Sequence, residues 1–411
     1  MQTAPTLSQS NDVVATACPE IDLLLCCARS RIDAVMAERI RGLLREKIDW
    51  DFLLPIAVKH GAIPMLYQSL KGVDADAVPQ TVLDLLRQAF ELNAQRNLFL
   101  TRELLRLLKQ LAECDIPAVP FKGLVLAASV YGNLALRVFG DLDILVRKQD
   151  VGRAKQLVLS QDYRLLKPQL LMTPTQEVAY LEFQHEYLFE RKDGQVCVEI
   201  QWCFASRSFS LQLNPDRLWE RLESVSLAGS ELPNFSPEDV LLLLCVDGCK
   251  GRWNNLRRVC DVAELIRARP DLNWSRLLEY ASQLGSRRLL LLGLRLANEL
   301  LGARLPEEIW QAIRADREVE SLVCIVGERL FVPVRGTGDA LKRVLYPLFH
   351  LRARERWRDR IRYCWLAMMP TAKDWEFVPL PEALSFLYYG LRPIRLVRRY
   401  VWLQLKKLLR N

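Results

Sequence analysis

Histidine, the side chain that most often serves as a metal ligand or general base, is rare in this chain of 411 residues. Only His60, His185 and His350 occur, and no two of them are close in sequence. A His-rich metal site, or a mechanism that needs several histidines, is therefore not expected. The eleven cysteines include no CxxC pair and mostly lie in apolar runs, so they indicate buried reduced thiols rather than disulfides or a zinc site. If the protein is an enzyme, carboxylates must carry its chemistry.

Long apolar runs and a leader sequence are also missing. No uninterrupted stretch of about 18 apolar residues occurs, which excludes a conventional membrane-spanning helix. Residues 1–11 are polar and lack the basic-then-apolar pattern of a signal peptide. These absences predict a cytoplasmic protein. With 50% hydrophobic and 26% charged residues, the composition is that of a folded globular chain.

The formal net charge of +8 is concentrated at one end. Residues 331–411 contain 17 Lys and Arg against 6 Asp and Glu, a balance of +11, which leaves 40 against 43 for residues 1–330. Residues 395–411 interleave apolar and basic side chains and predict a basic amphipathic helix. This helix either packs on the protein's own core, lies on an anionic membrane surface or an acidic partner, or binds nucleic-acid phosphates. Nucleic acid is not favoured, because no nucleic-acid-binding motif accompanies the helix. The predicted location is therefore cytoplasmic, with peripheral membrane association left open.

Hydrophobic periodicity divides the chain into four regions. Residues 1–112 predict a helical N-terminal region, with one long helix starting at Thr81 and reaching Cys114. Residues 113–230 predict an α/β core of strand, helix, strand, helix and hairpin. Residues 231–330 predict a helical region that packs on this core and begins at the helix-capping Ser236, and residues 331–411 predict the basic helical end. The predicted fold class is α+β and predominantly helical.

Two aspartates occupy alternate positions of the segment 140–146, whose pattern is typical of a strand. Residues two apart in a strand point to the same face, so Asp141 and Asp143 present two carboxylates side by side. Like charges on an apolar strand are costly unless a cation neutralises them, and hard oxygen ligands suit Mg²⁺. Glu199 lies in a later apolar strand, 196–200, from which a third acid can reach the same ion. Lys122-Gly123 lies between a strand and a helix, where backbone N–H groups can receive a phosphate.

Each of these features also has a plainer interpretation. Paired acids occur on many surface strands, Lys122-Gly123 alone is more often a turn, and Glu199 could face solvent on a hairpin. Arg137 could simply cap a helix or pair with Asp141. The order of these residues along the chain, and their location in one α/β region, favour the interpretation that they form a single site.

The order of these residues resembles a known family. The matching segments are Phe121-Lys122-Gly123, Tyr131-Gly132, Arg137, Gly140-Asp141-Leu142-Asp143-Ile144-Leu145-Val146 and Val198-Glu199-Ile200-Gln201-Trp202. Together they are similar to the uncharacterised nucleotidyltransferases of the DNA polymerase β-like superfamily. The resemblance implies a small polymerase β-like core flanked by helical regions. It also implies that Asp141, Asp143 and Glu199 are metal ligands. The remaining implied nucleotide contacts are Lys122, Gly123 and Arg137 at the triphosphate and Lys250 at a phosphate.

The resemblance implies Mg²⁺-dependent transfer of a nucleoside monophosphate from an NTP to an acceptor, which would be a protein, a sugar or a small molecule. Two Mg²⁺ ions would serve the reaction, with Glu199 as third ligand or as acceptor base. Gln201 and Asp247 stand where histidine is expected in relatives. An inactive nucleotide-binding or scaffold protein of the same fold therefore stays open. So does a basic membrane-surface or nucleic-acid-binding protein whose acids are structural.

Two local predictions concern residues near this constellation. A two-residue hairpin loop pairs Glu199 with Leu188 and places His185 on the opposite face, whereas a bulged three-residue loop places His185 on the face of Glu199. Lys250, Asn254, Arg257 and Asp261 follow helical spacing, which predicts one polar stripe on the helix after Ser236. This stripe either is solvated or faces a nucleotide.

Overall fold

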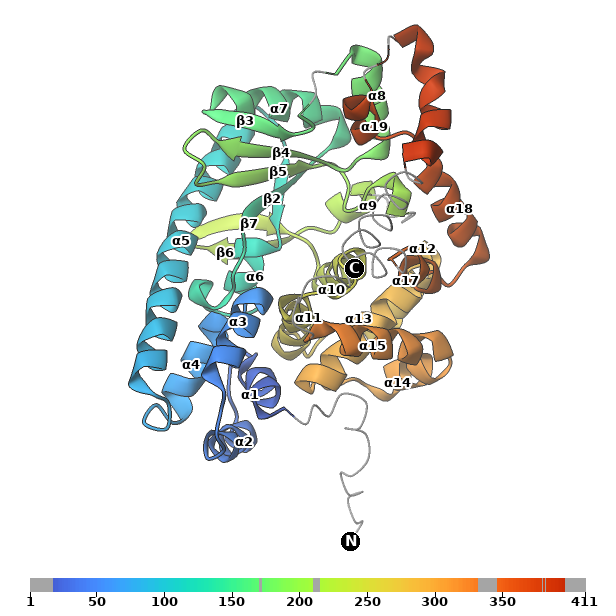
Figure 1. Ribbon diagram of the computed structural model, residues 1–411. Coiled ribbons are helices and arrows are strands. Elements are labelled where there is room, and N and C mark those ends of the chain that lie inside the picture. The colour runs from blue at the N-terminus through green and yellow to red at the C-terminus, as the bar shows by residue number, and fades with distance from the viewer. Residues whose placement is uncertain are drawn as a thin grey trace, which may run out of the picture.

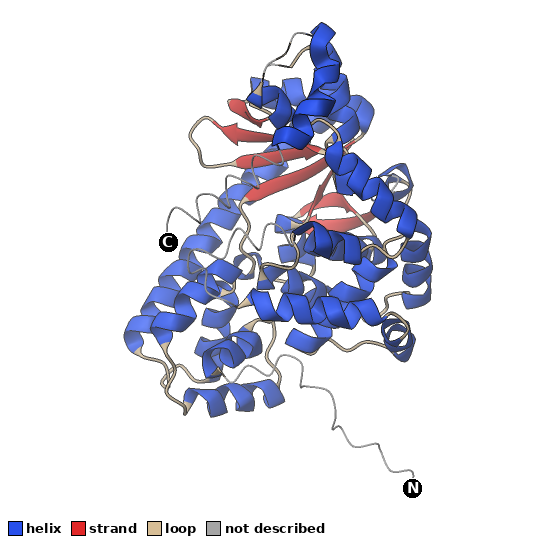
Figure 2. Cartoon of the chain, turned by 45° about the vertical axis from the view of Figure 1, so that its right-hand side comes forward, coloured by secondary structure: helices blue, strands red, loops and turns tan. Residues whose placement is uncertain are grey.

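The computed structural model describes residues 18–169, 172–209, 215–331, 346–378, 380 and 382–395. It is predominantly helical with one small mixed sheet, which confirms the predicted α+β class (Figures 1 and 2). None of the helices within these ranges is long and apolar enough to cross a bilayer. Of the predicted basic helix over 395–411, only Arg395 lies within the described residues.

Helices fill the N-terminal part of the chain. They are α1 (Pro19–Cys27), α2 (Ala34–Leu44), α3 (Trp50–His60), α4 (Ile63–Val73) and α5 (Gln80–Glu113). Helix α5 has 34 residues, about 50 Å at 1.5 Å per residue, and confirms the long helix predicted from Thr81. Its first half, with Val82 and Leu86, packs into the core of the other helices, whereas Leu100 and Leu104 belong to the core around the sheet. Helix α5 therefore links the two hydrophobic cores.

The sheet has five strands in the order β1-β2-β5-β4-β3. The strands are β1 (Ala118–Phe121), β2 (Asp141–Val146), β3 (Tyr163–Lys167), β4 (Glu186–Arg191) and β5 (Cys197–Gln201). Neighbouring strands are antiparallel except β2 and β5, which are parallel. The connecting elements are α6 (Gly123–Ser129), η1 (Leu134–Leu136), η2 (Lys148–Asp150), α7 (Val151–Ser160) and α8 (Pro174–Phe183). The strand, helix, strand, helix and hairpin predicted within residues 113–230 are confirmed as β1, α6, β2, α7 and the pair β4 and β5.

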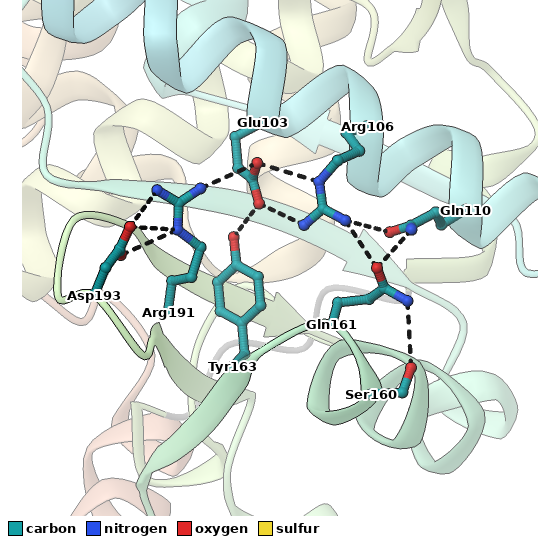
Figure 3. Close-up of polar contacts among 8 residues, drawn as sticks. All are labelled: Glu103, Arg106, Gln110, Ser160, Gln161, Tyr163, Arg191 and Asp193. Atoms are coloured by element: carbon teal, nitrogen blue, oxygen red, sulfur yellow. Dashed lines mark hydrogen bonds and ion pairs between the residues drawn. The ribbon is translucent and has the colours of Figure 1, made fainter.

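A polar cluster around the buried Glu103 fixes α5 to the outer strands of the sheet (Figure 3). The Glu103 carboxylate accepts hydrogen bonds from the Tyr163 hydroxyl and the Arg106 guanidinium, both at 2.6 Å. Arg191 of β4 approaches the same carboxylate at 3.3 Å. Because Glu103 is buried yet has three partners, these contacts hold the edge of the sheet against α5 without leaving an unpaired charge.

The chain becomes helical again after the small hairpin of β6 (Glu223–Leu227) and β7 (Ser230–Asn234). Short helical segments η3 (Arg207–Phe209) and α9 (Pro215–Trp219) precede this hairpin. The helices that follow are α10 (Pro237–Lys250), α11 (Leu256–Ala268), α12 (Trp274–Leu284), α13 (Arg287–Leu301), α14 (Glu307–Arg314) and α15 (Arg317–Leu330). The C-terminal elements are α17 (Tyr346–Arg352), α18 (Trp357–Met368), α19 (Ala372–Phe377) and η4 (Glu382–Leu387).

Helices from both ends of the sequence share one core. The apolar side chains of α10 to α15 pack in a single cluster with those of α1 to α4. One polar link between them is His60 at the end of α3, whose Nδ1 accepts a hydrogen bond at 3.0 Å from the backbone N–H of Leu256, the first residue of α11. Burial lowers the pKa of His60 to about 4, which keeps the ring neutral and able to accept this bond. The link fixes the start of α11, and α11 contributes to the site described next.

Candidate active site

The sheet and helices α10 and α11 enclose a polar cavity of about 350 Å³, within the range of small-ligand sites. Its lining residues are Lys122, Gly123, Arg137, Phe139, Asp141, Asp143, Glu186, Glu199, Gln201, Leu244, Asp247, Lys250, Gly251, Arg257, Arg258 and Asp261. All seven residues predicted as metal or nucleotide contacts are among them. Two groups are named below: the carboxylate face is Asp141, Asp143, Glu186 and Glu199, and the cation face is Lys122, Lys250, Arg257 and Arg258.

Strand register explains the carboxylate face. In the parallel pairing of β2 with β5, Asp143 is opposite Glu199 and Asp141 is opposite Cys197. Paired residues project to the same side of a sheet, and so do residues two apart in one strand. Asp141, Asp143 and Glu199 therefore lie on one face and line one cavity, as the sequence predicts.

The acids on this face perturb one another. Burial, with Asp141 and Asp247 nearby, raises the pKa of Asp143 to about 6 despite the positive charge of Lys122. Burial, Asp143 and Glu186 raise the pKa of Glu199 to about 8. Several carboxylates held together in a partly dry cavity favour protonation, and a bound cation would relieve this cost.

An amide joins two of these acids. The Gln201 Nε2 group donates to Asp143 Oδ1 at 2.8 Å and to Glu199 Oε2 at 2.7 Å. Within the described part of the chain, no three Asp, Glu, His or Cys side chains form a group that could hold a metal ion as they stand. The donor set nevertheless fits Mg²⁺ chemically, because it consists of carboxylate oxygens whose raised pKa values reflect an excess of negative charge. A cation at this face would take the place of the Gln201 amide between Asp143 and Glu199.

The cation face begins at the turn between β1 and α6. Lys122 and Gly123 have φ angles of 55° and 25°, a left-handed conformation that favours glycine at the second position. Lys122 Nζ forms an ion pair with Asp247 Oδ1 at 2.9 Å, and Arg258 Nε reaches Asp247 Oδ2 at 3.1 Å. Burial alone would lower the pKa of Lys122, but Asp247 and Asp143 hold it above its ordinary value. Lys122 is therefore a charged group inside the cavity.

Arg137 lines the cavity, but its guanidinium is occupied. Its Nε and Nη2 atoms each donate at 2.8 Å to the Asp261 carboxylate, which also accepts from the Tyr131 hydroxyl at 2.8 Å. The alternative that Arg137 pairs with Asp141 is wrong, because its partner is on α11. Asn97 donates to the Arg137 backbone oxygen at 2.9 Å. Arg137 therefore fixes the turn beside Gly123 to α11 and shapes this end of the cavity.

Lys250 enters the cavity from the end of α10. Its Nζ donates to the Phe204 carbonyl at 3.0 Å and lies 3.2 Å from His185 Nε2. His185 Nε2 is also 2.9 Å from Glu186 Oε2. Burial and Lys122 lower the pKa of Lys250, and burial lowers the pKa of His185.

The hairpin register settles one open alternative and adds a residue. Leu188 pairs with Glu199, as a two-residue loop predicts, so Glu186 rather than His185 shares the face of Glu199. His185 precedes β4 and does not line the cavity, but its ring contacts Lys250, which does. Sequence reasoning missed Glu186, since its place on the face depends on a register that the sequence did not fix.

The prediction of one polar stripe from Lys250 to Asp261 is wrong. Helix α10 ends at Lys250 and α11 begins at Leu256, with Asn254 in the turn between them. Arg252 and Trp253 in this turn have positive φ angles of 55° and 52°, which end the first helix. Lys250 and Asp261 therefore reach the cavity from two different helices.

A family model described as uncharacterised nucleotidyltransferase matches residues 46–302, more than half of the chain and the whole of the cavity lining. The chain belongs to this nucleotidyltransferase family. No curated protein matches the chain significantly. Membership of the nucleotidyltransferase family supports nucleotidyl transfer as the general function, and a transferase as the class of protein.

Proposed function

We propose that this nucleotidyltransferase moves a nucleoside monophosphate from an NTP to an acceptor in a Mg²⁺-dependent reaction. The supporting observation is that one cavity of about 350 Å³ is lined by both the carboxylate face and the cation face. Carboxylates that hold Mg²⁺ next to cations that bind phosphates are the pairing of charges that a metal–triphosphate complex requires.

Asp141, Asp143 and Glu199 would hold the metal. Bound Mg²⁺ would neutralise charge on the phosphates and stabilise the departing pyrophosphate. The acceptor oxygen or nitrogen attacks the α-phosphorus, the bond to the β-phosphate oxygen breaks, and the acceptor proton passes to a base. Glu199 serves either as the third ligand or as that base, and burial among other carboxylates raises its pKa above that of an ordinary glutamate, which strengthens it as a proton acceptor.

The cation face binds the triphosphate in this scheme. Lys122 and Arg258 both contact Asp247, so the phosphates would compete with that carboxylate for the two cations. Lys250 and Arg257 add positive charge to the same cavity. Charge neutralisation and positioning then supply most of the rate enhancement, and no histidine is required.

Nucleotide binding without turnover is the second candidate. It is favoured by Gln201, which joins Asp143 to Glu199, and by Asp247, which pairs with Lys122. Both residues stand where histidine is expected in relatives, and both contacts fill positions that substrate or metal would use.

The test uses each NTP with a radiolabelled α-phosphate, Mg²⁺ and cell extract. We expect label to enter an acceptor with wild-type protein and to fall at least about 100-fold with Asp141→Asn. Glu190→Gln is the matched control, since Glu190 lies on β4 outside the cavity lining. Undiminished transfer by Asp141→Asn would contradict the proposal, and wild-type NTP binding without any transfer would support the second candidate.

A further inference from the structure

Helix α18 turns four large apolar side chains outward. Trp357, Ile361, Trp365 and Met368 are 73%, 60%, 66% and 44% exposed. Their spacing of four, four and three residues places them on one face of the helix. A surface helix normally turns such a face toward the core. These four residues are called the α18 outer face below.

The opposite side of α18 is attached through the buried Leu366 and through polar groups. Asp359 is buried, Arg360 Nε donates to the Arg354 carbonyl at 2.9 Å, and the Arg354 guanidinium lies 4.1 Å from the centre of the Tyr363 ring. These contacts fix the rotation of the helix about its axis. Figures 1 and 2 show α18 on the outside of the molecule, at its right-hand edge in Figure 1. The contacts on the inner side of α18 therefore hold the α18 outer face toward solvent.

Positive charge borders this apolar surface. Arg358 and Arg362 lie beside the α18 outer face, and neither forms an ion pair with a described residue. The one acidic residue of α18, Asp359, is buried on the other side. The exposed indole and aliphatic groups of the α18 outer face thus lie next to two arginines that no described carboxylate neutralises.

We propose that the α18 outer face binds the surface of an anionic phospholipid bilayer. Tryptophan is favoured at the boundary between headgroups and hydrocarbon, and an interfacial helix buries an apolar face there. Arg358 and Arg362 contact the negatively charged headgroups. This surface differs from the helix predicted over 395–411 and is independent of nucleotidyl transfer.

Charge complementarity selects this occupant over others. A second copy would bring the same two arginines, and no exposed acidic residue of α18, to the shared surface, which is unfavourable. Residues 396–411 contain five basic residues and no acidic one, so this segment carries the same sign of charge. A nucleic acid would satisfy the arginines but would leave Ile361 and Met368 in water. An anionic lipid surface provides both negative charge for the arginines and an apolar phase for the indole and aliphatic groups.

The test is flotation of the full chain with vesicles of phosphatidylcholine alone or mixed equally with phosphatidylglycerol. Wild-type protein should float with the mixed vesicles, and Trp357→Ser/Trp365→Ser should lower the bound fraction at constant lipid at least tenfold. Leu92→Ser/Leu98→Ser on α5 is the matched control, because these leucines are 59% and 56% exposed, and it should bind like wild type. Arg358→Gln/Arg362→Gln should abolish the preference for the mixed vesicles.

A second measurement does not depend on variants. Brominated lipid in mixed vesicles should quench part of the tryptophan fluorescence of the wild-type protein. Absence of flotation and quenching would overturn the proposal, as would equal binding by the double tryptophan variant. A wild-type dimer that the same variant splits, or wild-type RNA binding that it abolishes, would also overturn the proposal in favour of a second copy or a nucleic acid.

Discussion

The buried ion pair between Arg137 and Asp261 gives the sharpest test of how the site is held together. Their side chains are 6% and 4% exposed, and two hydrogen bonds of 2.8 Å join them. Arg137→Met removes both of these hydrogen bonds. The buried Asp261 carboxylate then keeps the hydrogen bond from the Tyr131 hydroxyl. Removing one partner of a buried pair costs about 3–5 kcal/mol, so we expect the free energy of unfolding to fall by this amount.

The double variant Arg137→Met/Asp261→Asn separates the pair from simple loss of packing. Asparagine still accepts the Tyr131 hydrogen bond but carries no charge, so the double variant should lose less stability than the sum of the two single variants. We expect a coupling energy of about 1–3 kcal/mol from urea unfolding followed by circular dichroism. Additive losses, or a loss below about 1 kcal/mol for Arg137→Met, would refute the reasoning that this pair anchors the turn.

Gln201→Met removes the amide between Asp143 and Glu199, so in EDTA the free energy of unfolding should fall by about 2 kcal/mol and Mg²⁺ should recover much of it. Unchanged stability in EDTA, measured by calorimetry, would contradict this. The pKa of Glu199 is about 8 in the folded protein and 4.5 in the unfolded chain, so without metal this group makes stability fall as pH rises from about 5 to 8. Mg²⁺ binding in that pH range should therefore release protons. Titration calorimetry in two buffers of different ionisation enthalpy measures this release, and equal binding enthalpies in the two buffers would refute the prediction. A Cβ at Gly248 would lie 2.4 Å from an indole ring, so Gly248→Ala should cost about 1–3 kcal/mol. The control Gly72→Ala, with nothing within 4 Å, should be neutral or slightly stabilising, and equal thermal midpoints would contradict the argument.

The sequence pattern predicts those helices and strands that are determined by residues close together in the chain. The alternation around Asp141 and Asp143 predicts β2, and the capping Ser236, whose hydroxyl accepts from the Asp239 N–H at 3.3 Å, marks the start of α10. Strand β3 was not predicted, because its Arg-Leu-Leu-Lys centre has no clear alternation and its position depends on pairing with β4.

Contacts between distant residues set the rest of the site. Arg137 pairs with a residue 124 positions away, which no local pattern encodes. Glu186 joins the carboxylate face only because Leu188 pairs with Glu199. The outward orientation of α18 depends on polar contacts such as that of Arg360 with Arg354, so the arginine-rich sequence alone does not reveal it.

The most direct test of the proposed function compares NTP labelled on the α-phosphate with NTP labelled on the γ-phosphate, in the presence of Mg²⁺ and the acceptor fraction. Nucleotidyl transfer predicts that the α-label becomes covalently attached to the acceptor and that the γ-label leaves in pyrophosphate. Asp143→Asn should abolish both outcomes. Attachment of the γ-label to the acceptor, or equal transfer by wild type and Asp143→Asn, would contradict the assignment of the carboxylate face as the centre of nucleotidyl transfer.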